Sequence, residues 1–313
     1  MRGKSRRITV IRLLRAAAAL TVLFSLLTGI DIPYHAIELF SHFRLQYFVL
    51  SILLFLIFAY LRHVSFAALL ALVAIFNATL VLPWYFGDVD TAHGKPLKLI
   101  YANVRSSNTH YSRLITFIRE ENPDLIYLQE VTDAWLEGTK ELLKDYPYTY
   151  AEPRHGNFGT AAFSRIPFDS VRHVDSPPLN HPTIISSITV AGESITIIST
   201  HPTIPIGQSL FNARNEQLEG VAELVNETNG NVILLGDFNA SVWCMRFRQL
   251  EHTTSLTNVR KGFGILPSWP TFLPLVMIPI DQALVSNDIS VTDVRTGKRI
   301  GSDHLPLIVT VSL

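Results

Sequence analysis

Residues 232–241 read VILLGDFNAS, and they introduce a pattern that recurs through the second part of the chain. Four apolar residues lead into Gly236, after which Asp237 and Asn239 stand two positions apart. A short apolar run that ends at turn-forming residues is typical of a strand buried on both faces of its sheet. Asp and Asn often end strands as simple turn residues, but side chains two positions apart in an extended chain point the same way. The stretch therefore predicts a buried strand that ends either in a turn or in a pair of functional side chains.

Similar strands recur from residue 96 to the end of the chain. They alternate with polar loops and with two helical patterns, one at 112–122, before Pro123, and one at 211–228. The predicted strands cover residues 97–104, 124–131, 159–164, 184–190, 194–200, 232–239, 279–286 and 304–313. Many strands with few helices between them indicate an α/β fold, a sandwich in which sheets pack face to face with helices outside.

Polar residues stand at the ends of most of these strands. Carboxylate and amide oxygens suit a hard divalent cation, and imidazoles suit proton transfer. The sequence lacks the Cys–His and His–His spacings of zinc sites, so its oxygen donors favour Mg²⁺ or Mn²⁺. Taken alone, Asn103 and Asp281 can equally be turn residues. The full set is Asn103, Glu130, His201, Asp237, Asn239, Asp281, Ser302, Asp303 and His304.

The order of these residues resembles that of the endonuclease/exonuclease/phosphatase superfamily, which includes pancreatic-type deoxyribonuclease, neutral sphingomyelinases and inositol polyphosphate 5-phosphatases. The similarity covers about residues 96–313, and the matching motifs are IYANV, LIYLQEV, FGTAAFSRIP, STHP, LLGDFNAS, PIDQALVS and GSDHLPL. Each motif is weak alone, but the ordered combination is specific. The resemblance implies a four-layer α/β sandwich, with two mostly antiparallel sheets flanked by helices, and metal-dependent cleavage of a phosphate ester.

The resemblance also implies a role for each carboxylate and amide. Glu130 resembles the family's main metal ligand, with Asn103 and Asp303 beside it, and the metal is expected to be Mg²⁺ or Mn²⁺. A metal held in this way polarises the phosphoryl oxygen and neutralises developing charge. Asp237 is implied to orient and deprotonate the attacking water, and Asn239 to hold the phosphate or that water.

Two histidines complete the implied machinery. His304 resembles the residue that contacts a phosphate oxygen and stabilises the pentavalent state. Asp281 resembles the carboxylate that fixes this imidazole and favours its charged form. His201 matches the histidine that acts as general acid on the leaving group in deoxyribonuclease-like members. The carboxylate that orients that histidine is not evident in this sequence, and a loop histidine is the alternative for His201.

Other polar and aromatic residues carry weaker expectations. Arg214 lies in a helical pattern, where a solvated helix face is favoured over a role in steering an anionic substrate. Trp269 and Phe272 are expected either to line the substrate mouth or to form a buried aromatic plug. Surface or loop positions are expected for His155, His173, His181 and His252.

The substrate is constrained by charge more than by any motif. Residues 96–313 hold 17 basic and 22 acidic residues, a net charge of about −5, without a basic run. Nucleic-acid binding depends on phosphate neutralisation by Lys and Arg, so a phospholipid or small phosphodiester competes with DNA as substrate. We expect a phosphodiesterase, with a DNA endonuclease or exonuclease and a sphingomyelinase-like phospholipid hydrolase as alternatives. A catalytically idle binding domain is the non-enzymatic alternative.

Three apolar segments precede this domain, at about 11–30, 45–61 and 64–86. Each is near the ~20 residues that cross a ~30 Å hydrocarbon core. A cleaved signal peptide and a buried helical hairpin are the alternatives, but further apolar segments follow the first, and all three lack a polar face. The sequence therefore predicts a membrane anchor over residues 1–86, a linker over 87–95 and a catalytic domain over 96–313.

The orientation of the anchor follows from the placement of Lys and Arg. Residues 1–15 carry six basic residues and no acidic one, and the loop with Arg62 and His63 lies between the second and third spans. Positively charged loops stay in the cytoplasm, so three spans place the catalytic domain on the other side. We expect a membrane-anchored, bacterial-type member of the family in the inner membrane, with a cytoplasmic N-terminus and a periplasmic catalytic domain.

Overall fold

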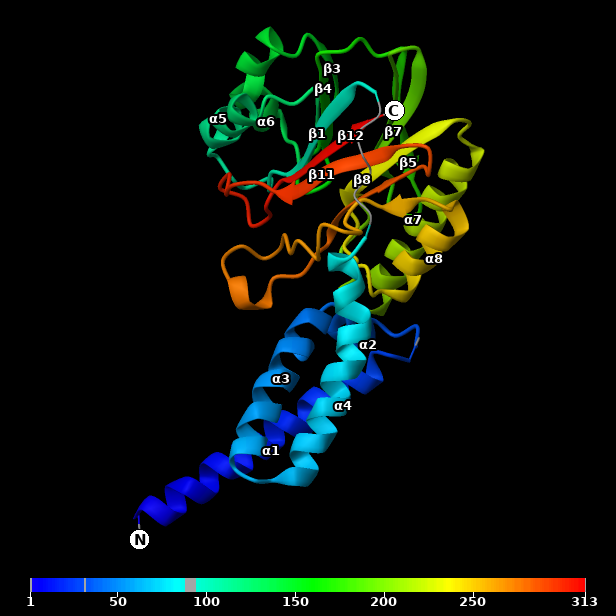
Figure 1. Cartoon of the computed structure of the whole chain (residues 1–313). Coiled ribbons are helices and arrows are strands. Elements are labelled where there is room, and N and C mark those ends of the chain that lie inside the picture. The colour runs from blue at the N-terminus through cyan, green and yellow to red at the C-terminus, as the bar shows by residue number, and fades with distance from the viewer. Residues whose placement is uncertain (1, 31, 88–93, 313) are drawn as a thin grey trace.

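A computed structural model describes residues 2–30, 32–87 and 94–312, with side chains from residue 9 onward. Residues 94–312 form two six-stranded sheets packed face to face (Figure 1). The first sheet has the order β11 (Ser290–Thr296), β12 (Leu307–Ser312), β1 (Pro96–Asn103), β2 (Leu125–Gln129), β4 (Thr160–Ser164) and β3 (Tyr148–Glu152). The second has the order β5 (Ser170–Ser176), β6 (His181–Val190), β7 (Glu193–Thr200), β8 (Asn231–Asp237), β10 (Asp281–Val285) and β9 (Thr257–Asn258).

Each sheet contains one parallel pair among antiparallel neighbours. β1 pairs parallel with β2, and β7 pairs parallel with β8. The carboxyl ends of parallel neighbours meet at one edge of a sheet, so residues that follow these four strands gather at one end of the sandwich. The register sets Asn103 opposite Gln129 in the first sheet and Asp281 opposite Asp237 in the second.

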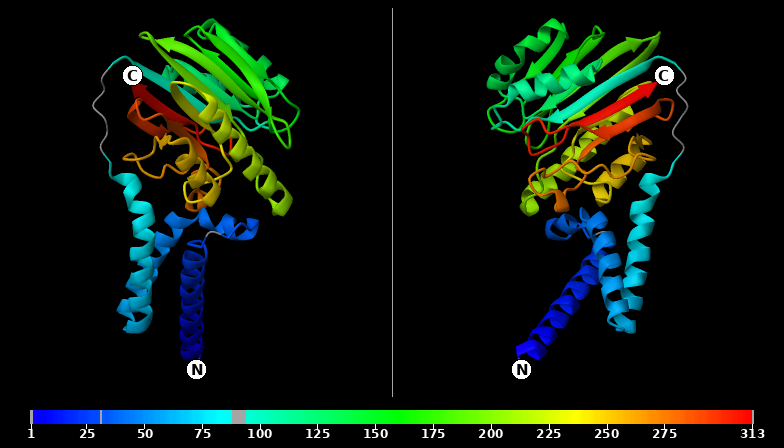
Figure 2. Two further views of the ribbon diagram at one scale, coloured as in Figure 1. Left: turned by 90° about the vertical axis from the view of Figure 1, so that its right-hand side faces the viewer. Right: turned by 60° about the vertical axis from the view of Figure 1, so that its left-hand side comes forward.

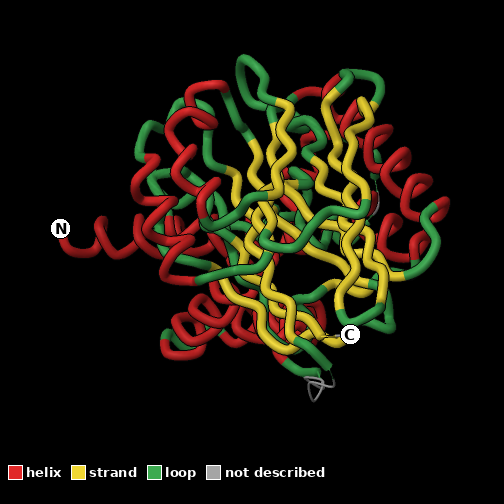
Figure 3. Tube along the Cα trace, turned by 90° about the horizontal axis from the view of Figure 1, so that it is seen from above, coloured by secondary structure: helices red, strands yellow, loops and turns green. Residues whose placement is uncertain are grey.

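Helices cover the outer face of each sheet and complete four layers (Figure 3). The first sheet is covered by α5 (Tyr111–Glu121), α6 (Asp133–Thr139) and the 3₁₀ helix η2 (Lys140–Lys144). The second is covered by α7 (Gly207–Glu227) and α8 (Met245–Thr254). Leu, Ile and Val from both sheets fill the space between them. This arrangement confirms the predicted four-layer α/β sandwich.

The predicted elements are found, and several short ones were missed. The helix expected at 211–228 begins four residues earlier, at Gly207, and the helix before Pro123 ends at Glu121 with Asn122 in the left-handed conformation. The prediction missed α2, α6, α8, β3, β5, β9, β11 and the 3₁₀ helices. These elements are short or half-exposed, so they show little of the continuous apolar patterning that marks buried strands.

The N-terminal part forms a separate group of helices below the sandwich (Figure 2). They are α1 (Arg2–Leu27), α2 (His35–Ser41), α3 (Arg44–Tyr60), α4 (Val64–Val81) and the 3₁₀ helix η1 (Leu82–Tyr85). Large apolar side chains such as Leu13, Leu56 and Leu72 point outward and are more than half exposed. An outward apolar surface of this size is typical of a region that contacts a membrane or another protein.

Two of these helices are long and apolar enough to cross a membrane, over Thr9–Leu27 and Val64–Tyr85. α2 and α3 are long and apolar enough to cross a membrane only when they are taken together, and a bend of 62° separates them. The structure thus supports two candidate spans, or three if the bent pair counts as one, where the sequence predicted three straightforward spans. Most of the predicted linker, residues 88–93, lies outside the described residues.

The helical group also contacts the sandwich directly. The Trp84 carbonyl accepts hydrogen bonds from the backbone N–H groups of Gly262 and Gly264, and the Trp243 indole donates to the Leu80 carbonyl. α2 lies across the end of α7, where a buried ion pair joins the two. The domain therefore rests on the helices in addition to being linked to them through the chain.

Candidate active site

A cavity of about 440 Å³ opens where the carboxyl ends of β2, β7 and β8 come together. Six of the eight predicted catalytic and metal-binding residues line it, and the remaining two, Asn103 and Asp281, contact lining residues. The lining members of the set are Glu130, His201, Asp237, Asn239, Asp303 and His304. Residues separated by up to 201 positions in the sequence therefore meet at a single site, as the resemblance implies.

Asp237 lies at the centre of this group. The Asn103 amide donates to Glu130 Oε1 at 3.0 Å and to Asp237 Oδ2 at 3.2 Å, which joins the two sheets. The same Oδ2 lies 3.5 Å from His201 Nε2 and 3.7 Å from His304 Nε2. One carboxylate oxygen is thus within reach of both histidines and of the residue that contacts Glu130.

His304 and Asp281 form a buried carboxylate–imidazole pair. His304 Nδ1 lies 2.9 Å from Asp281 Oδ2, and the position of Asp281 is fixed by the strand register opposite Asp237. Burial alone would lower the pKa of His304, but the charges of Asp281 and Asp237 outweigh it and raise that pKa to about 9. Burial would likewise raise the pKa of Asp281, and the charge and hydrogen bond of His304 lower it instead. His304 is therefore a cation at neutral pH.

The second histidine has the opposite electrostatic character. Burial, and next the positive charge of His304, lower the pKa of His201 to about 3, so this imidazole is neutral. Its Nδ1 is buried and has no hydrogen-bond partner among the described residues, which agrees with the missing orienting carboxylate. Burial raises the pKa of Asp237 above its usual range, against the opposing charge of His304. A carboxylate with a raised pKa is a better proton acceptor.

Backbone geometry holds two of the site residues in unusual conformations. Glu130 has φ +62° and Asn239 has φ +47°, which are left-handed values that cost energy for residues other than glycine. The Asn239 N–H donates to Asp237 Oδ1 at 2.9 Å, and its side chain donates to the Pro202 carbonyl, next to His201. The pair in VILLGDFNAS is therefore both a turn and part of the site.

Gln129 was missed by the sequence analysis, although it precedes Glu130 directly. Its side-chain oxygen accepts from the Tyr101 hydroxyl at 2.7 Å and from the Asp237 N–H at 3.0 Å. Its nitrogen donates to the Thr200 carbonyl at 2.5 Å. One buried amide thus ties β2 to β7 and β8 under the Asp237 carboxylate. An apolar run interrupted by a glutamine is the only signal for it in the sequence.

Gly236 is required by a close approach of two strands. A Cβ at this position would lie 1.9 Å from the Thr200 carbonyl oxygen, and φ is +156°. A side chain here would push β8 away from β7. The glycine in VILLGDFNAS therefore sets the distance between the strands that carry His201 and Asp237.

Several weaker predictions are corrected by the structure. Arg214 is fully buried rather than solvated: it pairs with Glu38 and donates to the Asn239 carbonyl at 3.0 Å. His181 is 9% exposed and stacks on Phe158 at 3.5 Å between ring centroids, so it is no surface residue. The alternating pattern around these positions gave no sign that distant elements would cover them.

Of the two aromatic residues in SWPTF, only Trp269 lines the cavity, and Phe272 is too exposed to form a buried plug. Trp269 borders the cavity, and its indole donates to Asp303 Oδ2 at 3.3 Å. Phe272 is 63% exposed. Asp303 therefore lies at the cavity wall, held by Trp269, with Arg105 Nε 3.9 Å from its other oxygen.

The donor set at the cavity fits a divalent cation. Glu130 is 9% exposed and forms no ion pair with any described residue, and it lies beside Asp237 through their shared contact with Asn103. Buried carboxylates without a neutralising cation are costly, and a bound cation removes that cost. Asp237, Asp281 and His304 also lie close enough to share an ion, but Asp281 Oδ2 and His304 Nδ1 already face each other at 2.9 Å in a hydrogen bond.

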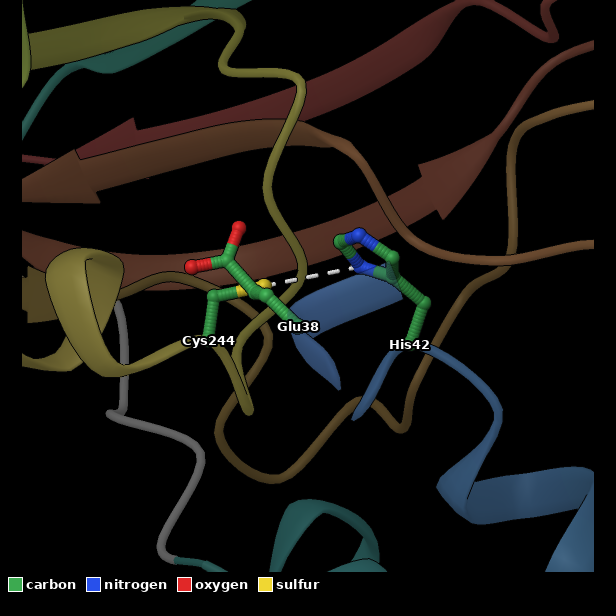
Figure 4. A group of neighbouring side chains, drawn as sticks. All are labelled: Glu38, His42 and Cys244. Carbon is green, nitrogen blue, oxygen red and sulfur yellow. Dashed lines mark hydrogen bonds between the residues drawn. The ribbon is translucent and has the colours of Figure 1, made fainter. Parts of the chain in front are cut away.

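A second cluster of potential ligands lies between α2 and the domain (Figure 4). It consists of Glu38, His42 and Cys244. Glu38 is already paired with Arg214, and His42 Nδ1 lies 3.0 Å from Ser241 Oγ. Burial raises the pKa of the Cys244 thiol to about 12. We therefore assign this cluster to packing between α2 and the domain.

Comparisons with known proteins agree with this geometry. A crystal structure of D. rerio TDP2 complexed with single-strand DNA product superposes with a TM-score of 0.61 at 18% identity, over 70% of this chain and all of that one. An endonuclease/exonuclease/phosphatase from Beutenbergia cavernae gives 0.56 at 19% identity, over 70% and 72%. One from Bacteroides vulgatus gives 0.59 at 13% identity, over 70% and 99%. At these identities the likeness concerns the fold alone.

No curated protein matches the sequence at a significant level. The family model described as "Endonuclease/Exonuclease/phosphatase family" matches residues 100–304, which is more than half of the chain and spans every residue of the site. The chain therefore belongs to the endonuclease/exonuclease/phosphatase family.

Proposed function

We propose that the protein is a membrane-anchored, divalent-metal-dependent phosphoric ester hydrolase. The observation that carries this proposal is the contact of one carboxylate, Asp237, with Asn103, His201 and His304 in a cavity that also holds Glu130. Asp237 as a base, His304 as a cation and Glu130 as a carboxylate without an ion-pair partner among the described residues together suit the attack of water on a phosphate ester.

In this mechanism Asp237 accepts a proton from water as the water oxygen forms a bond to phosphorus. The bond from phosphorus to the leaving oxygen then breaks, and that oxygen takes up a proton. His304, held charged by Asp281, stabilises negative charge on the phosphoryl oxygens. Asn239 is placed beside Asp237 to orient the water or the phosphate.

Glu130, Asn103 and Asp303 are the residues that would hold Mg²⁺ or Mn²⁺, which supplies Lewis-acid polarisation of the phosphoryl oxygen. The general-acid role of His201 needs its protonated form. Because a nearby anion raises the pKa of an imidazole, an anionic phosphate in the cavity favours that form. His201 would then donate the proton that the leaving oxygen requires.

The anchor is proposed to place this site outside the cytoplasm. α1 begins at the end of the helical group far from the domain (Figure 1), and the basic residues cluster at that end of the sequence. A reporter enzyme that is active only outside the cytoplasm, fused after Leu313, should be active. A fusion active only as a cytoplasmic reporter would contradict this orientation.

Hydrolysis is tested with the full chain in lipid nanodiscs, using bis-p-nitrophenyl phosphate and either Mg²⁺ or Mn²⁺. We expect Asp237→Asn and His304→Asn each to lower kcat by about 10²-fold or more, the usual contribution of a positioned base or charge. His155→Asn, in an exposed loop, is the matched control and should leave the rate unchanged. Equal rates for Asp237→Asn and the wild type would refute the proposal.

A further inference from the structure

The cavity is lined by apolar as well as polar side chains. Asp237 and His304 belong to the polar group described above. The apolar lining includes Leu39 in α2, Ile206 in the loop before α7, and Ile278, and α2 also contributes His42. Leu39 belongs to the helical group, so the N-terminal part of the chain supplies a wall of the active-site cavity.

Exposed apolar side chains lie on the two loops that supply Ile206 and Trp269 to the cavity lining. Ile206 is 64% exposed, and Phe272 and Leu275, which follow Trp269 in the chain, are 63% and 90% exposed. Exposed apolar side chains that gather near a cavity mark a ligand groove, a protein contact or a membrane contact. We refer to these three residues as the apolar rim.

The apolar rim lies beside α2 and α3: the loop with Phe272 and Leu275 contacts the start of α3, and Ile206 lies two residues before Gln208, whose Oε1 is 3.2 Å from His35 Nδ1 in α2. The loop that carries Phe272 and Leu275 reaches α3, where Gln46 Nε2 donates to the Met277 carbonyl at 2.8 Å. Figure 1 shows this orange loop next to the upper end of the helical group. α2 lies at the same level, between the candidate span Thr9–Leu27 and α3, with Phe40 partly exposed. If the helices cross a bilayer, the rim meets its surface.

We infer that the cavity takes a phosphate ester that carries a hydrocarbon chain, as the lipids of the surrounding bilayer do. The phosphate lies at Asp237 and His304, and the chain leaves the cavity past Leu39 and the apolar rim. A volume of about 440 Å³ suits a head group and the first part of a chain, so the rest of the chain stays in the bilayer. This inference rests on the proposed function and adds the class of substrate.

Nucleic acid fits this mouth less well. DNA binding needs several Lys or Arg side chains against phosphates. Among the described residues that line the cavity no Lys or Arg occurs, and residues 96–313 are net acidic. The apolar side chains of the rim cannot neutralise the phosphates of a nucleic acid.

The test uses the full chain in nanodiscs with Mn²⁺ and a series of water-soluble alkyl p-nitrophenyl phosphates, from methyl to hexyl. Water adds to phosphorus and p-nitrophenolate leaves, so the chemistry is the same throughout. Each methylene moved out of water contributes about fourfold, and we expect kcat/KM to rise at least about tenfold from methyl to hexyl. A rate independent of chain length, with measurable hydrolysis, would overturn the inference and leave the proposed function intact.

Variants locate the effect. Ile206→Asp with Phe272→Asp should reduce the hexyl-to-methyl ratio to about twofold or less, since a charge cannot shelter the chain. The conservative pair Ile206→Met with Phe272→Leu should keep the ratio. Leu143→Asp, at a 47% exposed position in η2 over the first sheet, is the control. A ratio unchanged in the Asp variant would contradict the rim assignment.

Two other outcomes separate the hypotheses. If no ester is hydrolysed under any metal condition, the proposed function fails and this inference fails with it. If single-stranded DNA is cleaved with a higher kcat/KM than the hexyl ester, and equally well by the Asp rim variant, the substrate is nucleic acid and the inference is wrong.

Discussion

The buried ion pair between Glu38 and Arg214 predicts that the helical group controls the order of the loop that contains Asn239. Glu38 lies in α2, and Arg214, in α7, also donates to the Asn239 carbonyl at 3.0 Å. The perturbation is Glu38→Gln, which removes the charge and keeps the shape. We expect α2 to separate from the domain more often, and Asn239 to lose its support.

The size of the effect follows from the surroundings of Arg214. This side chain is fully buried, and its other partners, the Asn239 carbonyl and Asn215 Oδ1 at 2.9 Å, are neutral. Removing one partner of a buried ion pair costs about 3–5 kcal/mol. Separation of α2 would expose Arg214 to water and so relieve the cost of a buried, unpaired guanidinium. We therefore expect the substitution to favour separation of α2 over global unfolding. At about 1.4 kcal/mol for each factor of ten, we expect the separated population to rise at least 100-fold.

Cys244 provides the assay because it is the only cysteine in the chain and lies beneath α2. Its Sγ is 3.6 Å from Ser41 Oγ. The same atom is 3.5 Å from His42 Nδ1 (Figure 4). A maleimide reagent can reach the thiol only after α2 moves. The labelling rate of the full chain in nanodiscs should therefore rise about 100-fold in Glu38→Gln, with a parallel loss of ester hydrolysis.

The matched control is Glu219→Gln, which breaks an exposed ion pair between α7 and Arg246, close to the same cysteine. Exposed pairs contribute at most about 1 kcal/mol, so labelling should change less than about fivefold. Labelling of Glu38→Gln within about threefold of the wild-type rate would refute the argument.

Three further predictions concern the sandwich itself. Gln129→Leu leaves the Tyr101 hydroxyl and the Asp237 N–H without partners. We therefore expect the free energy of unfolding to fall by about 2–4 kcal/mol, as measured by thermal unfolding. An unchanged melting temperature would contradict this prediction. A hydrogen bond from Arg295 is the main cause that lowers the pKa of Glu121 to about 2. The ionised Glu121 therefore stabilises the folded protein fully above its ordinary pKa near 4.5, and this contribution disappears as the pH falls through 2. The difference in melting temperature between wild type and Glu121→Gln should shrink over that range. Glu130→Gln should weaken Mn²⁺ binding at least about tenfold, because losing even a residue that only supports a ligand has an effect of this size. Electron paramagnetic resonance measures the binding. The control Glu137→Gln, which removes an exposed carboxylate, should bind Mn²⁺ normally.

The sequence predicted the sandwich well because its buried strands are apolar on both faces. Runs such as LKLIYAN and VILLGDF cannot lie at a surface, so their existence and ends are decided locally. The edge strands β5 and β11 are partly exposed and read as mixed polar sequence. α2 was missed because seven residues in a short loop between apolar segments carry no helical period of their own.

The sequence predicted which residues line the site, but not the residues that hold them in position. Polar residues at strand ends were visible because their neighbours are apolar. Arg214 and Gln129 act through residues far away in the chain, and no local pattern reveals that Glu38 or the Thr200 carbonyl will be their partner. The bend between α2 and α3 was likewise hidden, since the anchor was interpreted as three simple spans.

The contact between α2 and the domain is intramolecular, and this has a consequence for its strength. α2 is joined to helices on both sides, so it stays near its partner surface at an effective concentration on the order of millimolar. An interaction too weak to hold two separate molecules together therefore remains formed in the intact chain. A truncated protein that begins near residue 94 would lose this tether, and with it one wall of its cavity. A synthetic peptide of α2 added at micromolar concentration would leave most of that surface vacant.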